Sequence, residues 1–163
     1  MRMLYLLFLI CTSSDLIACD LDKCISVEVP HIENSNDTLN TDSMKLKITV
    51  GETVLTATMY DNPTTGDFIS LLPLTLTLKD FNSTEKISDL PEKLSVKDAP
   101  ASYRPLVGDI TLYAPWGNLA LFYKDFGYSN GLILLGKIDS GMEAFKVSGT
   151  VNVKIEVIVQ NTQ

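Results

Sequence analysis

The chain has 163 residues and a formal net charge of −7, and 45% of its residues are apolar while 20% are charged. This length leaves room for one ordinary domain behind a leader, and the composition excludes a disordered tail protein or a fibrous repeat. The 20 acidic residues outnumber the 13 basic ones, and no basic cluster occurs, which argues against a nucleic-acid partner.

Residues 1–18 are predicted to be a signal peptide of the lipoprotein type. Arg2 supplies the positive charge, and residues 4–11 form an apolar stretch that is too short to span a bilayer as a helix. The segment from Leu16 to Cys19 resembles the lipobox of bacterial lipoproteins, which implies that Cys19 carries lipid and becomes the new N-terminus. We therefore expect an exported protein that a lipid anchors to the cell membrane or holds in the periplasm. Ordinary cleavage without lipid and a natural start at Met44 stay open as alternatives.

Residues 19–43 are predicted to form a flexible polar tether, because Asn, Asp, Ser and Thr dominate its second half. Residues 25–29 alternate like a strand, so a short edge strand is an open alternative there. All three cysteines lie within the first 24 residues, so we expect no disulfide in the globular part. His31 is the only histidine and lies in the tether, so we expect neither a zinc site, nor a Ser/His/Asp triad, nor a cofactor.

The domain is predicted to span residues 44–160. A short helix is expected to begin at Asp61-Asn62-Pro63 and to end before Pro73, and a second one is expected at 140–145. Gly51 and Glu52 favour a type II′ turn, and 91–107 is predicted to be a long ordered loop. Apolar patterning predicts strands at 45–50, 53–60, 74–79, 85–90, 109–114, 119–124, 132–138 and 151–159. Most of these alternate between apolar and polar residues, whereas 119–124 is apolar on both faces and is expected to lie centrally in the sheet.

Seven or eight strands joined mainly by tight turns indicate a mainly β fold, either a closed or nearly closed barrel or a β-sandwich. Closure would leave no exposed edge on so apolar a set of strands. Patterning alone does not distinguish the two architectures, because it does not show whether the sheet closes.

Five runs of the domain carry a resemblance to a known family. They are Thr56-Ala57-Thr58-Met59-Tyr60-Asp61-Asn62-Pro63-Thr64, Leu71-Leu72-Pro73-Leu74-Thr75-Leu76, Gly108-Asp109-Ile110-Thr111-Leu112-Tyr113-Ala114-Pro115-Trp116-Gly117-Asn118-Leu119, Phe122-Tyr123-Lys124-Asp125-Phe126-Gly127-Tyr128 and Leu135-Gly136-Lys137-Ile138-Asp139. With these runs, the stretch from Met44 to Ile158 resembles the uncharacterised bacterial cyclophilin-like fold proteins. The resemblance implies a closed barrel of about eight strands with two short helices, and it implies no activity.

Prolyl isomerisation in true cyclophilins uses an Arg beside a hydrophobic pocket, and their Phe-His-Arg motif has no counterpart here. Arg104 is the only Arg outside the leader, and it lies in a proline-flanked loop, so no catalytic residue is carried over. A solvated Arg104 and a Trp116 that caps the barrel end are the structural alternatives to ligand contact. The residues predicted to contact a ligand are Tyr103, Arg104, Tyr113, Trp116 and Phe122.

The predicted function is a non-catalytic module that binds a peptide or a small molecule. The alternative is a divergent peptidyl-prolyl isomerase that acts on exported proteins. A groove that holds Arg104 beside aromatic side chains would favour the enzyme, whereas an Arg104 away from the groove would favour the module.

Overall fold

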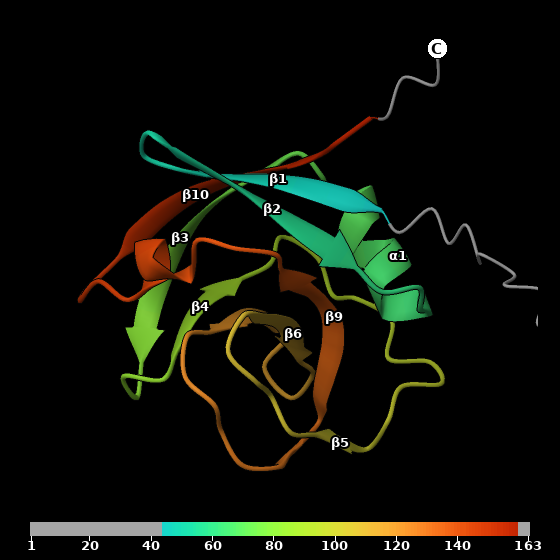
Figure 1. Cartoon of the computed structure of the whole chain (residues 1–163). Helices are drawn as coiled ribbons and strands as arrows, with labels where there is room; N and C mark the ends of the chain where they lie inside the picture. Colours follow the sequence, from blue (N-terminus) through green and yellow to red (C-terminus); the bar gives the residue numbers. More distant parts are fainter. Residues whose placement is uncertain (1–43, 160–163) are drawn as a thin grey trace, which may run out of the picture. The chain divides into compact units, whose positions relative to one another are not determined.

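The computed structural model describes residues 44–159, and eight of its strands form a closed antiparallel barrel (Figure 1). Neighbouring strands follow the order β1-β10-β3-β4-β7-β6-β9-β2, and β2 pairs with β1 to close the ring. Closure decides for the barrel and against the sandwich. The barrel strands are β1 (Lys45–Val50), β2 (Thr53–Met59), β3 (Leu74–Phe81), β4 (Glu85–Asp89), β6 (Asp109–Tyr113), β7 (Asn118–Phe122), β9 (Leu132–Ile138) and β10 (Val151–Val157).

Two tight turns set the register of the hairpins. Gly51 has a φ of 57°, as the predicted turn between β1 and β2 requires. Asn82 and Ser83 have φ values of 49° and 52°, which is the type I′ geometry that suits the right-handed twist of a hairpin. This second turn places Phe81 of β3 directly opposite Glu85 of β4.

The first predicted helix is confirmed as α1 (Pro63–Ser70). The Asn62 side chain accepts a hydrogen bond from the Thr65 amide at 2.9 Å, and Pro63 occupies the first turn, where a missing N–H is tolerated. The second predicted helix is a single 3-10 turn, η1 (Met142–Phe145). It stays short because its hydrogen bonds join residues three apart and no side chain caps it.

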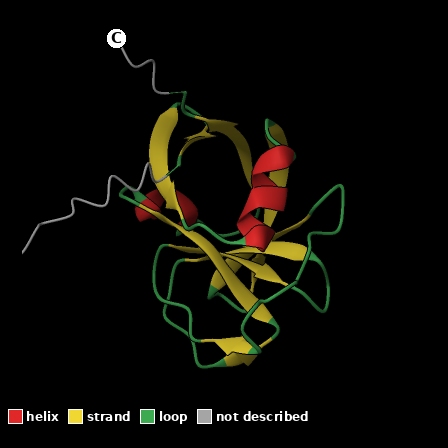
Figure 2. Cartoon of the chain, turned by 90° about the vertical axis from the view of Figure 1, so that its right-hand side faces the viewer, coloured by secondary structure: helices red, strands yellow, loops and turns green. Residues whose placement is uncertain are grey.

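The predicted loop at 91–107 contains a strand that the sequence pattern did not indicate. This strand, β5 (Ser102–Tyr103), pairs with β8 (Ser129–Asn130) as a separate two-stranded sheet. The small sheet lies below the barrel in Figure 2. Two residues are too few for alternation to reveal, so only the tertiary pairing identifies this sheet.

The core lies inside the barrel and takes every second residue of most strands. In β7, for example, Leu119 and Leu121 point inward and are almost fully buried. Phe68 of α1 and Phe145 of η1 have no exposed surface and complete this core. All five residues of β7 are buried, so the side that faces away from this core is largely covered as well, and Ala120, Phe122 and Leu132 form a second small cluster there.

The predicted signal peptide, the lipid attachment at Cys19, the tether and the strand at 25–29 lie outside the described residues. Within residues 44–159, neither helical segment has the length and apolar character needed to cross a membrane.

Candidate functional site

A cavity of about 280 Å³ lies on the outer face of the barrel wall formed by β4, β7, β6 and β9. Its floor comes from the side of β7 that faces away from the core, because Asn118, Ala120 and Phe122 alternate with the inward leucines. The loop after β7 adds Phe126 and covers part of this floor. The lining residues are Phe81, Asn82, Thr84, Glu85, Ile87, Tyr113, Trp116, Asn118, Ala120, Phe122, Phe126, Ser129 and Leu132.

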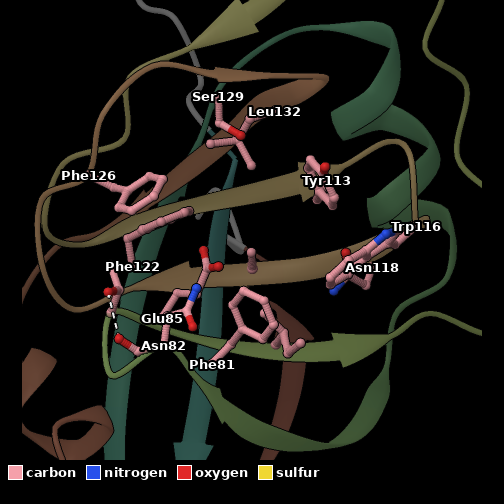
Figure 3. Close-up of a pocket in the computed structure, with 13 residues that line it drawn as sticks. Phe81, Asn82, Glu85, Tyr113, Trp116, Asn118, Phe122, Phe126, Ser129 and Leu132 are labelled. Carbon is pink, nitrogen blue, oxygen red and sulfur yellow. Dashed lines mark hydrogen bonds between the residues drawn. The ribbon is translucent and has the colours of Figure 1, made fainter.

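Aromatic rings border the cavity at both ends (Figure 3). At one end Trp116 meets Phe81 and Tyr113 edge to face, with ring centroids 5.6 and 5.3 Å apart. At the other end Phe122 and Phe126 stack with centroids 6.4 Å apart. Trp116 is 60% exposed, so its ring lines the mouth of the cavity while its contacts hold it in place.

Within the part of the chain that the structure describes, Glu85 is the only acidic residue that lines the cavity, and it lies between Phe81 and Phe122 (Figure 3). Burial raises the pKa of its carboxyl group to about 7, because the apolar surroundings disfavour the charged form. Among the described residues, no ion pair reaches this carboxyl group. The cavity therefore holds an acid that titrates near neutral pH.

Charged groups on the neighbouring elements contact partners other than Glu85. Asp80 and Lys86 form an ion pair of 2.8 Å with each other. Lys124 lies over the ring of a core tyrosine, and Asp125 accepts a hydrogen bond from a backbone amide of the preceding loop. No lysine, arginine or histidine is among the residues that line the cavity.

Asn118 contributes a second polar group at the Trp116 end. Its side chain is 3% exposed, and within residues 44–159 no protein group donates a hydrogen bond to its Oδ1 atom. A buried oxygen without a partner is unfavourable by about 1–3 kcal/mol. This oxygen is itself covered by protein, since less than 1 Å² of its surface is accessible, so the surrounding side chains and not the cavity enclose it.

Tyr103 supports the cavity from behind instead of lining it. Its hydroxyl donates to Asp109 Oδ2 at 2.8 Å, and the Leu106 amide donates to the same oxygen at 2.8 Å. Burial, together with this hydrogen bond to a carboxylate, raises the pKa of Tyr103 above its usual range. Tyr103 packs against the buried cluster of Ala120, Phe122 and Leu132, so it helps to position the floor.

The structure brings together three of the five residues predicted to contact a ligand. Tyr113, Trp116 and Phe122 line the same cavity, whereas Tyr103 and Arg104 do not. Arg104 directly follows β5 and is exposed. The Trp116 side chain forms part of the wall of this cavity on the outer face of the barrel.

The sequence analysis did not single out four other lining residues, namely Phe81, Glu85, Asn118 and Phe126. Position 85 was taken only as the start of a strand. The signal that could have found it is the turn at 82–83, which places position 85 opposite an aromatic residue. Among residues 44–159, no three His, Cys, Asp or Glu side chains gather as metal ligands.

The fold is similar to a solved structure of low sequence identity. It matches the solution structure of the hypothetical protein AF2241 from Archaeoglobus fulgidus with a TM-score of 0.54 and 19% identity, covering 70% of this chain and 94% of that one. At this identity the likeness shows the fold alone. A comparison with curated proteins found no match. The sequence model of a protein family described as "Cyclophilin-like family" matches residues 48–156. This match spans most of the chain and agrees with the closed barrel, so the chain belongs to the cyclophilin-like family.

Proposed function

We propose that this domain is a non-catalytic binding module that takes a small ligand, or one side chain of a peptide, in the cavity on its outer wall. The observation that supports this proposal most is the preformed aromatic lining, in which Tyr113, Trp116 and Phe122 border a cavity of about 280 Å³. Ligand sites are typically concave and mainly apolar, with few polar groups, and this volume is near the lower end of their range. A compact ligand fits better than an extended one.

The position of Arg104 supports binding without turnover. In true cyclophilins an Arg beside the proline pocket stabilises the transition state, and catalysis depends on such differential stabilisation. Here Arg104 is exposed and is not among the lining residues. Among residues 44–159, no basic side chain lines the cavity. The cavity therefore offers contact surface for a ligand but no donor of the kind that isomerisation requires.

A protease-coupled assay on an Ala-Pro peptide tests the catalytic alternative. We expect the rate of isomerisation to stay at the uncatalysed background. Turnover well above background that disappears in Arg104→Ala would establish the divergent isomerase instead, and turnover that persists in that variant would equally overturn the non-catalytic assignment.

Binding can be followed at Trp116, because it is the single tryptophan of the chain. Its indole N–H resonance is expected to shift in a saturable way with 2-phenylethanol or with 2-phenylethylamine as the probe. Phe126→Ala removes one exposed wall of the cavity and should weaken the response. Tyr128→Ala is the matched control, because Tyr128 is 77% exposed on the same loop and does not line the cavity. No saturable shift with either probe would contradict the proposal.

We further propose that the module is exported and anchored by lipid at Cys19. The support is the apolar stretch followed by the segment from Leu16 to Cys19. Each buried methylene of an attached chain contributes about 0.8 kcal/mol to membrane binding, so two or more acyl chains would hold the protein firmly. Intact-mass analysis of protein from the membrane fraction tests this. An unmodified chain that starts at Met44 in the cytoplasm would refute it.

A further inference from the structure

The polar groups in the cavity indicate which chemical class of ligand it takes. We propose that the ligand is an organic ammonium ion, with its positive charge at Glu85 and an apolar body along the aromatic walls. This inference rests on the proposed binding function and adds the identity of the charged group. It follows from two features of the cavity: an unpaired carboxyl group and flanking aromatic rings.

The first feature is the carboxyl group of Glu85. It lines an apolar cavity and forms no ion pair among residues 44–159. A carboxylate in such surroundings loses favourable hydration without gaining a partner. An ammonium group would restore that lost interaction through a charge-assisted hydrogen bond, which is shorter and stronger than a neutral one. The raised pKa of Glu85 is consistent with this missing partner.

The second feature is the pair of rings beside this carboxyl group. Phe122 lies directly opposite Glu85 across the β4–β7 pairing, and Phe126 stacks on Phe122. Figure 3 shows both rings at the Glu85 end of the cavity. The faces of aromatic rings attract cations, and they do so more strongly where water is excluded. An anionic ligand would meet the opposite conditions, since no basic side chain lines the cavity and the chain carries a net charge of −7.

Matched probes can test the charge preference in the full chain at pH 8, where Glu85 is ionised. The pair 2-phenylethylamine and 2-phenylethanol differs chiefly in the charged group, and 3-phenylpropionate supplies the opposite charge. Following the Trp116 indole N–H resonance, we expect the amine to bind at least about tenfold more tightly than the alcohol. The carboxylate should bind more weakly than either.

Glu85→Gln separates the charge from the shape of the cavity. This variant should reduce the preference for the amine over the alcohol to less than about threefold while the alcohol still binds. Glu52→Gln is the control, because it changes the net charge equally but lies in the exposed β1–β2 turn. Its preference should equal that of the wild-type protein.

The outcomes distinguish this inference from the proposed function. Equal binding of amine and alcohol to the wild-type protein would overturn the ammonium assignment and leave the binding function in place. A preference that survives in Glu85→Gln would also overturn it, because the selectivity would then arise elsewhere. Absence of binding by both 2-phenylethylamine and 2-phenylethanol would overturn the proposed function together with the inference.

Discussion

Glu85→Gln should stabilise the protein at alkaline pH and should have a much smaller effect near pH 5. Because burial raises the pKa of this carboxyl group from 4.5 to about 7, the folded protein binds the proton more tightly than the unfolded chain does. Between these two values the folded state carries more protons, so the free energy of unfolding falls as the pH rises and levels off above about 7. The glutamine side chain is neutral at every pH, so this fall in the free energy of unfolding does not occur in the variant.

The size of the effect follows from the pKa difference. At about 1.36 kcal/mol per pKa unit the full difference amounts to roughly 3 kcal/mol. Glu85 lines an open cavity whose water screens the charge, so we expect about half of this, roughly 1.5 kcal/mol, as the extra stability of the variant at pH 8.

Urea unfolding at pH 5 and pH 8 measures this difference, with Glu52→Gln as the control for a loss of one surface charge. We expect the control to change the free energy of unfolding by less than about 0.5 kcal/mol at either pH. An NMR titration of the Glu85 carboxyl carbon gives the pKa directly. A midpoint below 5, or a Glu85→Gln variant no more stable than the wild-type protein at pH 8, would refute the view that this carboxyl group is desolvated and unpaired.

Three further predictions concern the barrel itself. Lys86→Met should lower the free energy of unfolding by about 3 kcal/mol or more, because the buried ammonium group pairs with Asp80 and two backbone carbonyls. In the same urea experiment the control Lys154→Met, on the exposed face, should lower it by no more than about 1 kcal/mol. Similar losses in the two variants would contradict the burial argument. Gly136→Ala should lower the free energy of unfolding by about 1–3 kcal/mol, because the added methyl group would lie 2.6 Å from a carbonyl oxygen of β2. An unchanged midpoint of thermal unfolding would show that β2 and β9 separate easily. The free energy of unfolding of residues 44–163 alone should differ by less than about 2 kcal/mol from that of a chain that starts at position 20, because the barrel closes without the upstream segment. A larger loss would indicate that the upstream segment packs on the barrel.

Local sequence pattern was sufficient to predict most of the strands. The residues predicted for the first strand, 45–50, and for the strand at 132–138 agree with β1 and β9 at both ends. Alternation with a period of two reports which side of a strand is buried, and each strand of this barrel buries a side against the same core. The capping of α1 by Asn62 was also readable, because a side chain caps an amide only three residues away.

Barrel closure and the site depended on contacts between distant parts of the chain. Alternation is the same in a sandwich and in a barrel, and only the pairing of strands far apart in the sequence, such as β1 with β10, distinguishes the two. Tyr113, Trp116 and Phe122 were recognisable as candidates because large aromatic side chains are common in binding sites. Glu85 was not recognisable as a candidate, because an acidic residue in a strand is ordinarily solvated. Its position opposite Phe122, and its burial there, arise only when β4 and β7 pair.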